Sequence, residues 1–177
     1  MSVCQCEVVV RGISPLLMHR FPLVPIEGIE KLTAAQQAEI AAYRDEKGGL
    51  FVPAVNVQRA LVSAAAFSKG KGRASLQKQA AACLLVSPEH LSLGTDRYTI
   101  DSRAVVIAAT KGRIVRHRPR LDEWQLTFIL QWDGVLLKET EVRRIVDDAG
   151  QRVGLLDFRP ERKGPFGRFM VTTWRNE

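Results

Sequence analysis

Apolar and polar residues alternate in several stretches of the chain, which is the pattern of strands with one buried face. In 3–11, every second residue from Cys4 to Val10 is apolar. The alternation is clearest in 124–132, where Trp, Leu, Phe, Leu and Trp stand at every second position. Two further strands are expected, at 98–108 and 166–174.

Four segments have the spacing or the residue types of helices. Thr33, with Gln36 three residues later, matches a capping box, and strong helix formers follow it. Asn56 is the expected N-cap of a second helix that ends near Phe67. The other two helices are expected over 76–84, stopped by the Ser87-Pro88 pair, and over 139–149, with Gly150 as C-cap.

This order of elements predicts the fold class. Strand, helices, strand, strand, helix and strand is the order of an α+β, ferredoxin-like (RRM-like) βαββαβ fold with a helical insertion after the first strand. We expect one domain over 1–177, with a four-stranded antiparallel sheet. Right-handed crossovers would place the helices on one face of this sheet and leave the other face free to bind a ligand.

Length and composition narrow the class of protein. The chain has 177 residues, of which 46% are hydrophobic and 25% charged, so a mainly disordered protein is not expected. It has no run of about 18 uncharged apolar residues, which a membrane-spanning helix would need. The first residues lack the features of a secretory leader, and three cysteines do not suit a disulfide framework. We therefore expect a cytoplasmic protein that has no contact with a membrane.

Positive charge is concentrated in three segments. The chain carries 26 Lys and Arg against 19 Asp and Glu, a formal net charge of +7. Six of these cations lie in 103–120, four in 69–78 and four in 159–168, and Glu161 is the one acid within the three segments. Such clustering is expected of a surface that meets a polyanion. The alternative is a set of solvated loops that keep the protein soluble.

The segment 154–169, with the sequence GLLDFRPERKGPFGRF, combines three features of a nucleic-acid contact. Its glycines accept positive φ angles or a close backbone approach, and its cations suit phosphates. Phe158 and Phe166 offer flat faces on which bases can stack. The alternative is a structural loop whose phenylalanines belong to the core. The glycine spacings of dinucleotide-binding and Walker motifs do not occur.

The strand order and this segment together resemble the RAMP superfamily of CRISPR-associated RNA-binding proteins. The stretches RGISPLLMH at 11–19 and FVPAVN at 51–56 are similar to that superfamily as well. The resemblance implies a ferredoxin-like domain with a glycine-rich loop before the last strand. It also implies binding of guide or target RNA, beside other protein subunits or further copies of the same chain. A phage or mobile-element relative fits the same residues.

We expect the three basic segments to converge on one trough for single-stranded nucleic acid, RNA rather than DNA. No metal and no cofactor is expected, because the cysteines and histidines lack the spacing of ligands. The residues expected to contact the nucleic acid are Lys69, Lys71, Arg73, Lys111, Arg113, Arg116, His117, Arg118, Phe158, Arg159, Arg162, Lys163, Phe166 and Arg168.

Two other functions remain open. In metal-independent endoribonucleases of the same superfamily, a histidine near the end of the first strand is a general base. The resemblance places His19 in that role, with Arg20 or Lys111 steadying the charge that develops on phosphorus. The third possibility is a phage or mobile-element assembly protein whose basic loops dock on an acidic partner.

Overall fold

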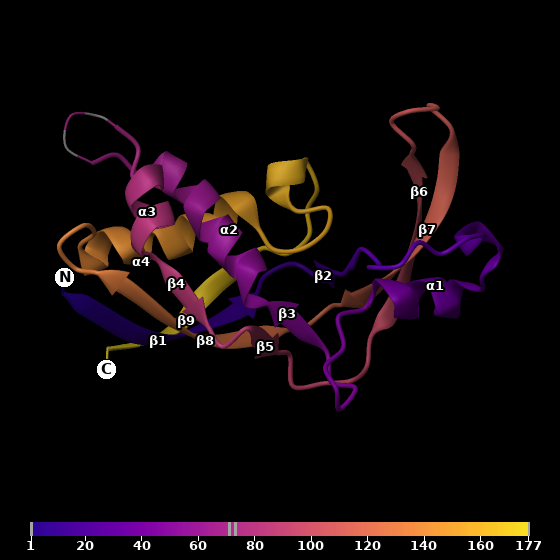
Figure 1. Ribbon diagram of the computed structural model, residues 1–177, viewed down its shortest axis with the longest axis horizontal. Helices are drawn as coiled ribbons and strands as arrows, with labels where there is room; N and C mark the ends of the chain where they lie inside the picture. Colours follow the sequence, from indigo (N-terminus) through magenta and orange to yellow (C-terminus); the bar gives the residue numbers. More distant parts are fainter. Residues whose placement is uncertain (1, 71, 73, 177) are drawn as a thin grey trace.

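The computed structural model describes residues 2–70, 72 and 74–176 and has a mixed α+β fold with antiparallel sheets (Figure 1). The strands of its main sheet are β1 (Val3–Gly12), β4 (Leu85–Ser87), β8 (Gln125–Asp133) and β9 (Phe169–Asn176). Their spatial order is β4-β8-β1-β9, and every neighbouring pair is antiparallel.

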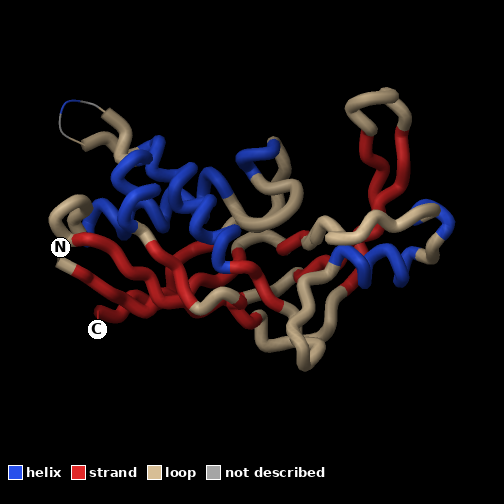
Figure 2. The backbone as a smooth tube through the Cα atoms, in the orientation of Figure 1, coloured by secondary structure: helices blue, strands red, loops and turns tan. Residues whose placement is uncertain are grey.

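Helices cover one face of this sheet (Figures 1 and 2). They are α2 (Ala54–Ala64), α3 (Gln77–Cys83) and α4 (Glu139–Asp148), whereas α1 (Ala34–Ala41) lies away from the main sheet. Short 3-10 turns occur at Ile29–Lys31, Ala65–Phe67 and Pro160–Arg162, and α4 continues into a π-helical turn at Ala149–Val153.

The core lies between the sheet and α2, α3 and α4. The apolar positions of β8, with Leu126, Phe128 and Leu130, are fully buried and belong to one cluster with residues of α2 and α4. Gly150 is needed in this packing, because a Cβ at that position would lie 2.2 Å from the carbonyl oxygen of Phe169. The alternation of 124–132 therefore predicted both the strand and its buried face.

A two-stranded hairpin projects from the main sheet (Figures 1 and 2). Its strands are β6 (Thr99–Val106) and β7 (Arg113–Leu121), paired from Thr99 opposite Arg120 to Val106 opposite Arg113. The short β2 (Leu16–Leu17) pairs with β7, and a separate ladder joins β3 (Phe51–Pro53) to β5 (His90–Ser92). We call β6, β7 and the turn 107–112 between them the arm.

Two expectations about the sheets need correction. Segment 98–108 does form a strand, but this strand, β6, pairs with β7 and not with the main sheet. The fourth place in the main sheet belongs to β4, three residues that follow α3 directly. No strand was expected at 110–120, yet this segment is mostly strand β7, because its backbone pairs with β6 along the whole length of β6.

Three expectations about helix ends have different outcomes. The capping box is confirmed, since Thr33 Oγ1 accepts from the N–H of Gln36 and the side chain of Gln36 accepts from the N–H of Thr33. Asn56 does not cap α2, which begins at Ala54; its side chain accepts a hydrogen bond from the N–H of Leu156 instead. Gly150 is not a C-cap, because the helical backbone continues to Gly154, whose φ is 75°.

In the described part of the chain, none of the helices has the length and apolar character needed to cross a lipid bilayer.

Candidate nucleic-acid interface

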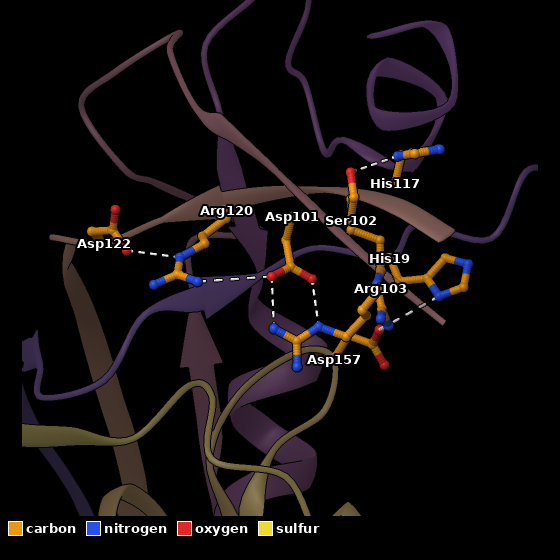
Figure 3. Close-up of polar contacts among 9 residues, drawn as sticks. His19, Asp101, Ser102, Arg103, His117, Arg120, Asp122 and Asp157 are labelled. Carbon is orange, nitrogen blue, oxygen red and sulfur yellow. Dashed lines mark hydrogen bonds and ion pairs between the residues drawn. The ribbon is translucent and has the colours of Figure 1, made fainter. Parts of the chain in front are cut away.

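Segment 154–169 and the base of the arm come together (Figure 3). Arg118 of β7 donates a hydrogen bond to the carboxylate of Asp157. The guanidinium carbon of Arg103, on β6, lies 5.4 Å from the ring centre of Phe158 and 4.8 Å from that of Phe166. Two of the three basic segments are therefore in contact at the base of the arm.

Lys69, from the third basic segment, does not reach this contact. It is exposed and follows the C-terminal end of α2, which points away from the arm (Figure 1). Lys71 and Arg73, also expected to contact nucleic acid, lie outside the described residues. For Lys69, the expectation of one trough shared by all three segments is corrected, because the length of α2 lies between Lys69 and the arm.

Asp101 organises the base of the arm. Its two carboxylate oxygens each accept a 2.7 Å hydrogen bond from Arg103, through Nε and Nη2. Arg120 lies 3.7 Å from the same carboxylate and donates a 2.8 Å bond to Asp122 (Figure 3). The hydrogen bonds from Arg103, with the charges of Arg118 and Arg120, hold the pKa of Asp101 below its usual value. Asp101 is therefore a carboxylate that fixes the positions of two arginines.

Asp157 lies at a strained point of the backbone. Leu156 and Phe158, on either side of it, have φ angles of 58° and 47°, values that residues other than glycine seldom adopt. Two hydrogen bonds hold this conformation: the N–H of Leu156 donates to Asn56 Oδ1 at 3.1 Å, and the N–H of Asp157 donates to the carbonyl of Leu17 at 3.0 Å. Strain of this kind gathers at functional sites.

The carboxylate of Asp157 faces the guanidinium of Arg118 and the imidazole of His19. Besides accepting from Arg118, it lies 3.5 Å from Nδ1 of His19. Burial alone would raise the pKa of Asp157, but the interactions with His19 and Arg118 outweigh burial and lower it from 3.8 to about 2. Asp157 is therefore ionised at neutral pH and holds the imidazole of His19 and the buried guanidinium of Arg118.

Three neighbouring hollows in the surface, which we call the line of hollows, include or adjoin these residues. A groove of about 570 Å³ lies between α2 and the turn Pro160–Arg162 and is lined by Arg59 and Arg162. It shares Asn56 and Arg159 with a cavity of about 170 Å³ that includes His19, Tyr43 and Asp157. His19 in turn lines a narrow crevice between α1 and β7, with Arg20, Arg116 and His117. The three hollows are therefore neighbours.

Five of the residues expected to contact nucleic acid line these hollows: Arg116, His117, Arg118, Arg159 and Arg162. On the arm, Lys111 and Arg113 are exposed, Arg116 is half-buried and His117 makes a 2.7 Å hydrogen bond with Ser102 (Figure 3). In segment 154–169, the exposed cations are Arg162, Lys163 and Arg168. Arg159 is half-buried and donates to Glu161 and to the carbonyl of Leu156.

Two expected contact residues are less accessible than the sequence suggested. Phe166 is only 4% exposed, and the guanidinium groups of Arg103 and Arg120 lie over its ring. Arg118 is 5% exposed and bonded to Asp157. Both side chains therefore lie beneath the surface and support the residues above them. Their direct contact with nucleic acid stays a prediction.

The sequence did not single out Arg59 or Arg103 as site residues. Arg59 stands alone on the amphipathic α2, and nothing near it in sequence marks it. Arg103 belongs to the basic segment 103–120, but its place over two rings depends on contacts with residues more than 50 positions away. Within 2–70, 72 and 74–176, no three His, Cys, Asp or Glu side chains gather closely enough to hold a metal ion.

The sequence matches no known family model and no characterised protein sequence. The fold is similar to a chain of the Type III-B Cmr-beta complex bound to cognate target RNA, solved by cryo-electron microscopy. The TM-score is 0.57, the sequence identity is 9%, and the alignment covers 99% of this chain and 61% of that one. At this identity the likeness is one of fold, and this chain spans about three fifths of its neighbour's length.

Proposed function

We propose that this protein binds single-stranded RNA as a non-catalytic subunit of a CRISPR-type ribonucleoprotein. The observation that carries the proposal is the fold similarity over 99% of the chain to a subunit of a complex bound to RNA. The resemblance of the strand order and segment 154–169 to the RAMP superfamily supports the same proposal.

We propose further that the chain is a single RAMP-type domain with ferredoxin-like topology. The supporting observation is the chain order β1, α2 with α3, β4, β8, α4 and β9, combined with the spatial order β9-β1-β8-β4. A split βαβ arrangement has this order, in which the third strand of the chain pairs with the first. In this proposal, the arm and α1 are additions to the domain.

The RNA strand in this proposal follows the line of hollows. It enters the groove beside Arg59 and Arg162, passes the cavity at Asp157 and His19, and leaves along the exposed cations of the arm. Arginine guanidinium groups suit phosphate because their planar forks donate two parallel hydrogen bonds. Contact with about five phosphates would give a slope near −3.5 for log affinity against log salt.

A titration of a fluorescent single-stranded RNA against salt concentration tests this proposal. We expect affinity to fall steeply with salt, and the double variant Arg59→Ala/Arg162→Ala to make the slope less negative by about 1.4. The charge-matched control is Arg97→Ala/Arg144→Ala, two exposed arginines away from the hollows. Binding that is absent, or equal in the two double variants, would contradict the proposed path.

The pairing of His19 with Asp157 supports a second candidate function, metal-independent RNA cleavage. Asp157 lies 3.5 Å from Nδ1 and so can orient the ring, which leaves Nε2 to take the proton from a 2′-hydroxyl. The 2′-oxygen would then bond to phosphorus as the bond from phosphorus to the 5′-oxygen breaks, and the 5′-oxygen would take a proton from water. Cleavage in EDTA that is lost in His19→Ala would establish this activity, and intact RNA would exclude it.

A further inference from the structure

We propose that the guanidinium of Arg103 is a stacking platform for a nucleobase of the bound RNA. This inference rests on the proposed function and adds to it a contact with a base. Sequence reasoning assigned stacking to the rings of Phe158 and Phe166. The structure instead has the guanidinium of Arg103 over both rings, with Phe166 buried and Phe158 half-buried.

The two phenylalanine rings support Arg103 from one side. Their ring centres are 5.9 Å apart, and the guanidinium carbon lies 5.4 Å from one centre and 4.8 Å from the other. Phe166 is buried, so a base cannot reach that ring without displacing the arginines. The side chain of Arg103, by contrast, is 34% exposed. An incoming base can therefore reach Arg103, whereas it cannot reach Phe166.

Asp101 fixes the plane of the guanidinium. It accepts from Nε and Nη2 of Arg103, which is the two-pronged geometry that prevents the group from turning (Figure 3). Asp101 is itself buried and lies close to Arg120 as well. A flat group that is fixed before binding loses little conformational freedom when a base stacks on it.

The same carboxylate argues against a phosphate contact as the main role of Arg103. Its positive charge is already balanced by Asp101, and one edge of its donor fork is occupied. The flat face of the guanidinium remains available and is weakly hydrated. Bases of single-stranded RNA stack on such guanidinium faces. Stacking of this kind accepts every base, so we infer a contact that holds the strand without reading its sequence.

The test uses a series of single-stranded RNAs that carry one 2-aminopurine, each at a different position, because the fluorescence of this base reports stacking. With the wild-type protein, we expect a change in fluorescence at one position of the bound strand. Arg103→Lys keeps the charge but removes the plane. We expect it to weaken binding about tenfold, to abolish the fluorescence change and to leave the salt slope unaltered.

Arg44→Lys is the matched control. Arg44 also pairs with an acid, Glu39, and lies 5.5 Å from the ring centre of Tyr98, but its other hydrogen bonds go to the carbonyls of Gly48 and Asp96 and not to segment 154–169. We expect this variant to bind RNA like the wild type. Thermal melting checks the folding of both variants. If Arg103→Lys fails to fold, Phe158→Leu removes one supporting ring while leaving the pair with Asp101 intact, and the same loss of fluorescence change is expected.

Three outcomes would overturn the inference. Full affinity and an unchanged fluorescence signal in Arg103→Lys would show that no base stacks on the guanidinium. Full affinity in Arg103→Lys together with a slope less negative by about 0.7 in Arg103→Ala would show a phosphate contact instead. Wild-type protein that binds no RNA would overturn the proposed function together with this inference, whereas the first two outcomes leave RNA binding intact.

Discussion

The helix-covered main sheet and the arm are stabilised in different ways. In the main sheet, apolar side chains of β1 and β8 pack beneath α2 and α4 and are fully buried. In the arm, most residues near the turn are exposed. They include apolar side chains, such as Val106 and Val115, as well as cations. Charges hold the base of the arm, where Asp101 and Asp157 bind three arginines.

This difference separates stability from binding. A side chain in the core of the main sheet contributes to the free energy of unfolding, because its removal leaves a cavity. A cation near the turn of the arm has little packing to lose and contributes to contacts with an anion instead. The base of the arm, where ion pairs are partly buried, should affect both properties. The four predictions below test this division, from the largest effect to the smallest.

Leu130→Ala in β8 should cause the largest loss of stability. The side chain is fully buried, so we expect the free energy of unfolding to fall by about 2–5 kcal/mol. Urea denaturation followed by circular dichroism measures this change. A loss below about 1 kcal/mol would mean that the core of the main sheet repacks easily, which would contradict the comparison.

Asp157→Asn should destabilise the base of the arm by about 1–3 kcal/mol at pH 7, because it weakens charged hydrogen bonds to a buried arginine. The folded pKa of about 2 lies below the unfolded value near 3.8, so the stabilisation is complete above that value. It is lost as the pH falls from about 4 towards 2.

The measurement is chemical denaturation of wild type and variant between pH 7 and pH 2. The difference between their free energies of unfolding should be constant near neutral pH and should fall to zero towards pH 2. Asp96→Asn, at an exposed aspartate, is the control and should show almost no difference from the wild type at any pH. A difference for Asp157→Asn that is independent of pH would contradict the ionised pairing.

Replacing Lys111, Arg113 and Arg116 by Ala together should change binding and not stability. We expect the salt slope for single-stranded RNA to become less negative by about 2, since three phosphate contacts are lost. The melting temperature should stay within a few degrees of the wild-type value. If instead the triple variant unfolds and its salt slope is unchanged, the arm has a structural role rather than a binding one.

Val115→Ala should have the smallest effect. Its side chain is 55% exposed on the arm, so the free energy of unfolding should change by less than about 0.5 kcal/mol. Urea denaturation beside Leu130→Ala gives the direct comparison of an arm valine with a core leucine. A loss as large as that of Leu130→Ala would mean that a further element covers the arm in solution.

The sequence predicted the elements whose signals are local. The alternation of 124–132 gave β8 and its buried face, and Thr33 with Gln36 gave the start of α1. It missed β4, because three residues are too few to show a period. It also missed β7, because arginines, a histidine and a proline hide the alternation, and pairing with β6 decides the conformation.

The candidate site was predictable only in part, because it depends on contacts between distant residues. The composition of segment 154–169 drew attention to that segment, which the structure brings into contact with the base of the arm. The covering of Phe166 by Arg103 and the bond between Arg118 and Asp157 join positions 63 and 39 residues apart, and no local pattern encodes either contact. Burial of these side chains is a tertiary effect that composition could not reveal.

The bond between Arg118 and Asp157 has a consequence for protein engineering. It joins β7 to segment 154–169, so the two stretches have to be exchanged together, although β8 and α4 lie between them in the chain. Consider a chimera whose hairpin β6–β7 comes from another protein and whose residues from 154 onward come from this one. In that chimera, Asp157 would face an unrelated side chain in place of Arg118. Recombinants should therefore remain functional only when both stretches come from the same parent.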